Sequence, residues 1–568
     1  MPPSSPTRRR RALALSTVLA LLLTSCGLIG GGDDGEETST GGVSLGATES
    51  GLADAGAPQR GGALVYGLEA EVGAKGYCLP ESELAISGMQ VARAIYDTLT
   101  VPDANGGYAP YLAKAVEHDD SYKVWTIALR AGVTFHDGSK LDSKVVKNNL
   151  DAYRGKYPAR SPLLFSFVLD NIDTVEAVNE LTVQVTTKVP WVAFPAVLYM
   201  SGRLGIMAQK QLDASTEQCA SEPIGTGPFS FASWERDVEL KVRRNPSYWQ
   251  DAPDGEPYPY LDAIEFRPIQ NSDTRVAELQ QGELNMMHTS TSADMAETLP
   301  ALRDAGTINL LVSSERTEVA YLMMNVKKEP LGDRRIRLAI AQAIDREALN
   351  EQANAGLPEV ADGPFAPGVL GHLDDTGFPS YDLAAAKEAV AALKADGVDT
   401  KLSLLTSAGP VAVRQAQIEK EMLEAAGFEI DLETETEADL ISRVIAGDYE
   451  IVGFRNQPGE DPDMNRVWWY GEGNPVNFGR FDDAVINDAL DLARSEPDVD
   501  KRRAAYEEIN REFAKQVWNV WLWHAPWAVA EAANVHGILG PDLPNGGGAP
   551  SPRLVTGHSL IGIWIDRG

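Results

Sequence analysis

The residues whose spacing most suggests chemistry follow Phe454, in the segment FRNQPGEDPDMNRVWW. Four oxygen-bearing residues of this region have the spacing of a calcium-binding loop: Asp461, Asp463, Asn465 and Glu472. Such a loop needs a glycine for its sharp turn, but Arg466 takes that position and apolar residues follow it. The pattern therefore gives only weak support for calcium.

Other patterns associated with catalysis also lack their structural context. GVSLG at 42–46 has the spacing of a nucleophile elbow, but it lies in a Gly- and Ser-rich stretch without a strand or helix to position the serine. GTGPF at 225–229 lacks the third glycine of a dinucleotide-binding loop and is better explained as a turn. The seven histidines show no zinc-protease spacing. We expect no catalytic residues, no metal and no cofactor.

The N-terminus has the features of an export signal. Four arginines, Arg8 to Arg11, precede the uncharged run Ala12–Leu23, which is shorter than the roughly 20 apolar residues that span a bilayer. The residues Leu23 to Gly27, LTSCG, resemble the lipoprotein signal in which cleavage precedes a cysteine and its thiol carries diacylglycerol. The resemblance implies lipidation of Cys26 and attachment to the outer face of the cell membrane. The paired arginines leave open whether export uses the general secretory or the twin-arginine route.

Residues 26–58 should form a flexible tether, because they are rich in small and acidic residues and poor in large apolar ones.

The net charge of −32 becomes more negative once residues 1–25 are removed, which argues against nucleic acid as a partner. A chain of 568 residues is too long for one core, so we expect two or three domains. After Cys26, only Cys78 and Cys219 remain, and an even pair in an exported protein permits a disulfide.

Two kinds of periodicity divide the chain. Apolar residues alternate in 122–130, 181–187 and 238–244, which predicts strands in the first half. A helical period appears in 334–349, where Ile336, Ile340, Ala343 and Ile344 share a face, and in 381–397. Between Lys401 and Phe454 the order strand, helix, strand, helix, strand predicts a parallel βαβαβ unit whose helices stop at Gly427 and Gly447. Ligands of such sheets lie beyond the carboxyl ends of the strands, so residues after Phe454 are candidates for contact.

Several segments, in this order, resemble the large extracytoplasmic solute-binding proteins of ABC importers for oligopeptides, dipeptides and nickel chelates. The similarity runs from about Gly61 to Trp527. The segments that carry it are Leu129–Val146, Pro223–Phe229, Arg244–Trp249, Gly282–Asn285, Arg335–Glu347 and Tyr381–Val390.

This resemblance implies an α/β fold, a two-lobed clamp of the periplasmic-binding-protein type (class II, large) with an extra subdomain in lobe I. Two strands are expected to cross between the lobes, and closure would follow solute binding. The expected divisions are signal peptide 1–25, tether 26–58, lobe I 59–107, 222–310 and 522–568, subdomain 108–221, and lobe II 311–521.

The resemblance also directs attention to the cleft. In peptide-binding relatives an aspartate after the third strand grips the ligand's ammonium; here Arg455, Asn456 and Gln457 are the nearest equivalents. If Arg455 faces the cleft, it favours a carboxylate or hydroxyl-rich solute; if it faces solvent, Asp461 can take the anchoring role. Aromatic side chains suit apolar or sugar-like groups. The predicted ligand-binding residues are Phe454, Arg455, Asn456, Gln457, Asp461, Trp468, Trp523 and His524.

The sequence thus predicts a monomeric, non-enzymatic receptor that delivers a small solute to an ABC permease. The solute is expected to be a peptide, with a sugar or a chelate as alternatives. Two other functions stay open at this point: a secreted lipoprotein hydrolase, and a sensor or chaperone that uses the same fold without transport.

Overall fold

The computed structural model describes residues 56–82, 84–162, 164–313, 318–456, 461–471, 473–551 and 560–568. All of them belong to the compact unit Gly42–Gly568. The signal peptide, the predicted lipidation site Cys26, nearly all of the tether and Gln457 lie outside these residues. Within the described part, no helix is long and apolar enough to cross a membrane.

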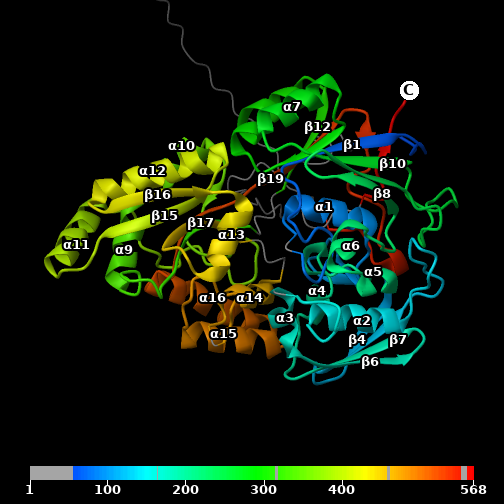
Figure 1. The fold of residues 1–568 in the computed structure, drawn as a ribbon, viewed down its shortest axis with the longest axis horizontal. Coiled ribbons are helices and arrows are strands. Elements are labelled where there is room, and N and C mark those ends of the chain that lie inside the picture. The colour runs from blue at the N-terminus through cyan, green and yellow to red at the C-terminus, as the bar shows by residue number, and fades with distance from the viewer. Residues whose placement is uncertain are drawn as a thin grey trace, which may run out of the picture. The chain divides into compact units, whose positions relative to one another are not determined.

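The first large sheet has seven strands and is covered by helices on both faces (Figure 1). Along β11 and β19, neighbouring side chains alternate between two cores: Met287 and Ala528 join the core under α7, whereas Met286 and Val529 join the core that includes α1. Strand β1 runs parallel to β10 and β11, and the other pairs are antiparallel. The strand order is β12 (Ile308–Ser313), β19 (Trp527–Ala532), β11 (Met286–Thr289), β1 (Ala63–Leu68), β10 (Ala263–Pro268), β9 (Glu239–Arg244) and β8 (Phe229–Glu235). Its helices are α1 (Ile86–Ile95), α7 (Ser272–Gln281) and α8 (Leu299–Asp304).

The second large sheet has six strands and contains the predicted βαβαβ unit. Strand β15 pairs in parallel with both β16 and β17, as expected. Helices α12 and α13 end at Gly427 and Gly447, whose positive φ values of 104° and 73° suit glycine. The strand order is β14 (Glu359–Val360), β18 (Asn519–His524), β13 (Val319–Met324), β17 (Ile451–Asn456), β15 (Lys401–Ser407) and β16 (Glu429–Glu435). Its helices are α9 (Arg334–Ala343), α10 (Arg346–Asn354), α11 (Leu383–Ala395), α12 (Pro410–Ala426), α13 (Glu437–Ala446), α14 (Arg466–Trp469), α15 (Ala484–Ser495) and α16 (Val499–Gln516).

The predicted helix over 334–349 is two helices, which corrects the sequence interpretation. Helix α9 ends at Ala343, and Ile344 is extended at φ −87° and ψ 110°. The Asp345 side chain accepts a hydrogen bond from the Ala348 amide and so starts α10. The four apolar residues of the predicted face are nevertheless all buried.

A four-stranded antiparallel sheet forms a smaller part of the chain. Its order is β4 (Ala113–His118), β5 (Val124–Leu129), β7 (Thr182–Thr187) and β6 (Ile172–Asn179). The helices around it are α2 (Ser143–Tyr153), α3 (Leu164–Val168), α4 (Phe194–Val197), α5 (Gln209–Asp213) and α6 (Thr216–Ser221). The sulfur atoms of Cys78, after β1, and Cys219, in α6, are joined in a disulfide with the Cα atoms 4.9 Å apart. Short strand pairs complete the fold: β2 (Thr100–Pro102) with β3 (Tyr108–Pro110), and β20 (Val535–His536) with β21 (Trp564–Ile565).

Below, the seven-stranded lobe, the six-stranded lobe and the four-stranded subdomain are the parts built on these sheets. The residue boundaries predicted for lobes and subdomain stay a prediction.

The glycine-rich turn 225–229 packs against α1: a Cβ on Gly225 would lie 2.0 Å from the Ile95 carbonyl oxygen. The need for glycine there is one of close packing rather than of binding a phosphate.

Candidate functional site

Two neighbouring chain crossings join the seven-stranded and six-stranded lobes. The chain leaves β12 at Ser313 and enters β13 at Val319, and it returns from β18 at His524 to β19 at Trp527. The two crossings are bonded to each other, because the Ala525 amide donates to the Glu318 carbonyl oxygen at 2.8 Å. Side chains at these strand ends therefore lie at the junction of the lobes.

A charged cluster surrounds Glu318 at this junction. Its carboxylate, on a residue only 7% exposed, accepts a hydrogen bond of 2.8 Å from Trp527 Nε1. Arg455 reaches it from the end of β17, with Nη1 3.6 Å from the same carboxylate oxygen, and its guanidinium lies 5.8 Å from the Trp527 ring centre. The Arg455 side chain keeps 46% of its surface exposed. The structure thus places Arg455 at the junction between the lobes, with its side chain partly exposed; whether it contacts a solute stays a prediction.

The four-stranded subdomain adds a further guanidinium to this region. Burial lowers the pKa of Arg203 to about 10; the Glu318 carboxylate opposes this shift, and the nearby Arg93 guanidinium adds to it. Arg203 Nε donates to the Leu84 carbonyl oxygen at 3.0 Å. Arg203 remains positively charged at neutral pH, so two cationic groups, Arg455 and Arg203, act on the Glu318 carboxylate.

The wall formed by the seven-stranded lobe is aromatic and polar. The His288 ring stacks on Trp527 with ring centres 5.5 Å apart, and its Nε2 lies 3.1 Å from Ser87 Oγ. The Glu69 amide donates to the same Nε2 at 3.2 Å, which places the ring proton on Nδ1. Burial lowers the pKa of His288 to about 3, so the imidazole stays neutral.

This Ser–His pair does not have the properties of a hydrolase centre. A general base works best with a pKa near the working pH, far above that of His288. A nucleophile triad also needs a third group on the other ring nitrogen, and Nδ1 has no hydrogen-bond partner among the described residues. Nor does any group of three or more His, Cys, Asp or Glu in the described part of the chain form a potential metal site.

Most of the other predicted ligand residues form hydrogen bonds or ring contacts within the six-stranded lobe. Asn456 is buried and donates to Asn465 Oδ1 at 3.1 Å. Asp461 accepts two hydrogen bonds from Arg502 Nη2, at 2.9 and 3.1 Å, and caps the following helical turn. Phe454 is half-buried between the rings of Tyr321 and Phe478.

The remaining aromatic candidates, Trp468, Trp523 and His524, also belong to the six-stranded lobe. Trp468 is half-buried, with its ring centre 5.8 Å from that of Phe478. Trp523 and His524 are 5% and 3% exposed; Trp523 lies opposite Ala320 in the sheet, and His524 opposite Val319 at the crossing. Sequence reasoning missed Glu318, since a single charge before an apolar strand carries no recognisable pattern.

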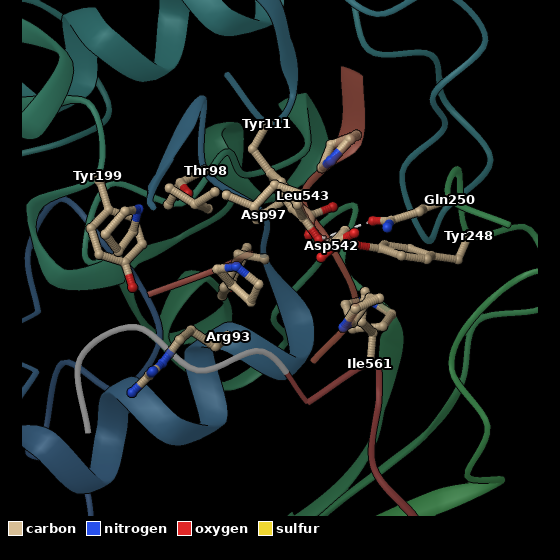
Figure 2. Close-up of a pocket in the computed structure, with 17 residues that line it drawn as sticks. Arg93, Asp97, Thr98, Tyr111, Tyr199, Tyr248, Gln250, Asp542, Leu543 and Ile561 are labelled. Carbon is tan, nitrogen blue, oxygen red and sulfur yellow. Dashed lines mark hydrogen bonds between the residues drawn. The ribbon is translucent and has the colours of Figure 1, made fainter. Parts of the chain in front are cut away.

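The cavity shown in Figure 2 has Arg93 in its wall but is not lined by Glu318, Arg455 or Trp527. Its volume is about 60 Å³, and none of the predicted ligand residues lines it. Its polar groups bond to each other: the hydroxyls of Tyr111 and Tyr248 are 2.9 Å apart, and Asp97 accepts hydrogen bonds from Tyr248, Trp249 and Thr226. Burial raises the pKa of Asp97 to about 6, while these three donors hold it down. The cluster at Glu318 therefore remains the candidate site.

Comparison with known proteins identifies the family of the chain. The family model described as "Bacterial extracellular solute-binding proteins, family 5 Middle" matches residues 107–478. The glutathione-binding protein GsiB of Salmonella paratyphi A is 32% identical over 302 residues, 52% of this chain and 55% of that protein. The chain thus spans about half the length of the curated relatives it matches.

Solved structures match over more of the chain. The binding protein AgaA of A. tumefaciens R10, in complex with agropinic acid, has a TM-score of 0.77 at 25% identity and covers 89% of this chain and 99% of its own. DppA of Helicobacter pylori, in complex with the peptide STSA, has a TM-score of 0.77 at 23% identity, covering 90% and 99%. The predicted α/β, two-lobed fold is confirmed by these neighbours.

Proposed function

Because the chain belongs to the family 5 bacterial extracellular solute-binding proteins, we propose that it is the solute receptor of an ABC importer. It captures a small solute at the junction of its two lobes and delivers it, chemically unchanged, to a membrane permease. Lipid on Cys26 holds it at the outer face of the membrane. The family match supports the receptor role, and the sequence LTSCG supports the anchor.

The solute carries at least one carboxylate, which Arg455 binds. The observation behind this proposal is the unequal exposure of the Glu318–Arg455 pair: the Glu318 side chain is 9% exposed and that of Arg455 46%. A solute entering the junction therefore meets the guanidinium rather than the carboxylate. The exposed guanidinium can donate charge-assisted hydrogen bonds to a carboxylate of the solute.

The charge around the site supports the same class of solute. Arginine binds a carboxylate through two parallel hydrogen bonds, and Arg203 adds positive potential nearby. Similar proteins are named for, or complexed with, glutathione, agropinic acid and a peptide, all of which carry carboxylates. We therefore propose an acidic peptide or a carboxylated peptide-like compound, with sugars and chelates as less suitable cargo.

The test compares Arg455→Ala with Arg511→Ala. Arg511 is 49% exposed and also forms an ion pair, with Glu507 on α16. Native mass spectrometry of the purified protein identifies retained solute, and calorimetry measures binding of glutathione, of dipeptides with neutral side chains and of the C-terminally amidated dipeptides. A charge-assisted hydrogen bond contributes about 1.5–3 kcal/mol, so Arg455→Ala should bind free acids about 10- to 100-fold more weakly. Arg511→Ala should bind them normally, and amidated ligands should not distinguish the variants.

An unchanged affinity of Arg455→Ala for the free acids would remove that residue from the site. If no carboxylated compound binds to the unaltered protein, the solute class is wrong. Turnover of any of these compounds would contradict a receptor that leaves its cargo intact.

A further inference from the structure

A tryptophan of the four-stranded subdomain is buried at the contact with the six-stranded lobe. Trp191, just before α4, has no exposed surface, and its Nε1 donates to Asp463 Oδ2 at 2.7 Å. Asp463 lies in the short 3-10 helix η4 (Pro462–Asn465) and is itself bonded to Arg494 on α15, at 3.0 and 3.1 Å. The Arg494 guanidinium also lies 4.6 Å from the Trp191 ring centre. We call these three residues the closure contact.

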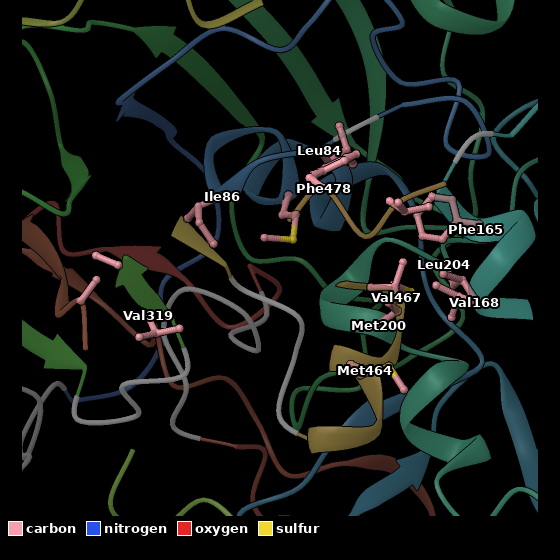
Figure 3. Close-up of a cluster of buried hydrophobic side chains, with 14 of the residues drawn as sticks. Leu84, Ile86, Phe165, Val168, Met200, Leu204, Val319, Met464, Val467 and Phe478 are labelled. Atoms are coloured by element: carbon pink, nitrogen blue, oxygen red, sulfur yellow. The ribbon is translucent and has the colours of Figure 1, made fainter. Parts of the chain in front are cut away.

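The closure contact is one point on a longer seam between the same two parts. Next to it, the Val192 amide donates to the Arg494 carbonyl oxygen at 3.0 Å. Phe167 of α3 meets Tyr470, which follows α14, with ring centres 6.3 Å apart. Figure 3 shows apolar side chains from both sides in one buried cluster, with Phe165 and Val168 of the subdomain near Val467 of α14. The subdomain and the six-stranded lobe are thus in contact at a place separate from the Glu318 cluster.

This contact can form and break reversibly because two of its three residues, Asp463 and Arg494, pair within one lobe. Asp463 and Arg494 belong to the same lobe, so their ion pair persists whether or not Trp191 is present. Parting the lobes breaks the hydrogen bonds of Trp191 and Val192 and exposes the apolar side chains of the seam, but it leaves no buried charge without a partner, which would cost far more. A contact of this kind can favour the closed arrangement without locking it.

The closure contact is also connected to the candidate solute site. Arg455 is followed in β17 by Asn456, whose side chain bonds to Asn465 in η4, and η4 carries Asp463. A solute held by Arg455 and a tryptophan held by Asp463 therefore act on one bonded segment of the six-stranded lobe.

We infer that Trp191 is a positioning residue that holds the lobes closed and sets how long a solute is retained. The inference rests on the proposed function for its effect on solute release, but the contact itself can be measured without any solute. Any opening that parts the subdomain from the six-stranded lobe breaks this hydrogen bond, so its removal should speed opening and leave association with the open form unchanged.

The experiment compares Trp191→Phe with Trp249→Phe in the full chain. Trp249 is a matched control: its Nε1 donates to the buried Asp97 at 3.0 Å and the Arg130 guanidinium lies 4.7 Å from its ring, but this set does not involve the six-stranded lobe. In solute-free protein, hydrogen exchange of the Val192 amide should be about tenfold faster in Trp191→Phe and unchanged in Trp249→Phe.

The second measurement uses glutathione as the probe solute. Its dissociation from Trp191→Phe should be about tenfold faster with the association rate unchanged, whereas Trp249→Phe should behave as the unaltered protein. Exchange at Val192 within twofold of the unaltered rate, or equal acceleration by both substitutions, would overturn the inference. If glutathione does not bind, the exchange measurement alone decides the role of Trp191, and the failure belongs to the proposed solute class.

Discussion

Removal of the Cys78–Cys219 disulfide should strongly destabilise the chain. The bond joins residues separated by 141 positions, and the enclosed loop contains the whole four-stranded sheet. In the chain-entropy model, opening a loop of this length costs about 5 kcal/mol, at the upper end of the usual range of about 2–5. Both cysteines are fully buried, so replacement by alanine adds a small packing loss in the same direction.

The assay is equilibrium urea unfolding of Cys78→Ala/Cys219→Ala, followed by circular dichroism and tryptophan fluorescence. Both the double variant and its parent carry Cys26→Ser, so that the two proteins do not differ in a lipid or in a third thiol. The free energy of unfolding should fall by about 2–5 kcal/mol. In the folded protein, dithiothreitol alone should act slowly, because both sulfurs are inaccessible. A double variant within 1 kcal/mol of its parent would refute the argument from loop length.

Two further predictions concern the membrane anchor and a buried acid. Cys26→Ser should move the protein from the membrane fraction to the soluble extracytoplasmic fraction, as fractionation and blotting will show; a variant that still pellets with membranes contradicts the anchor. Burial raises the pKa of Glu531 to about 8, above its ordinary 4.5, so unfolding releases a proton and stability falls as pH rises from about 5 to 8. Glu531→Gln should remove this loss, so the urea midpoint of the variant should gain on the parent toward pH 8. Parallel midpoints at pH 5 and pH 8 would exclude a protonated Glu531.

The elements that the sequence predicted best are those whose signals are local. The unit from β15 to β17 combines alternating apolar residues, a continuous helical period and glycine stops, and each signal acts within a few residues. The error at Ile344 has the same origin: the apolar period continues through the break, and only the capping preference of Asp345 indicates that a second helix begins.

The site was harder to predict because its contacts are distant in the sequence. The position of Arg455 after β17 was predictable, but its direction depends on Glu318 and Trp527, which come from two other strands. Trp191 and Asp463 are 272 positions apart in the sequence. They belong to parts of the chain that are built on different sheets. Neither residue type nor spacing encodes such a contact in a single sequence.

The structure also bears on the choice between an ammonium and a carboxylate as the recognised group. Among the described residues after β17, Asp461 was the candidate for binding an ammonium, but it is bonded to Arg502, a side chain only 10% exposed. Burial lowers the pKa of Arg502, yet the Asp461 carboxylate raises it above its ordinary value overall. Turning Asp461 toward a ligand would leave that guanidinium buried without its partner, at a cost of about 3–5 kcal/mol. Arg455 already presents 46% of its side-chain surface at the junction, so it can meet a solute without such an exchange of partners, and this favours a solute that presents a carboxylate.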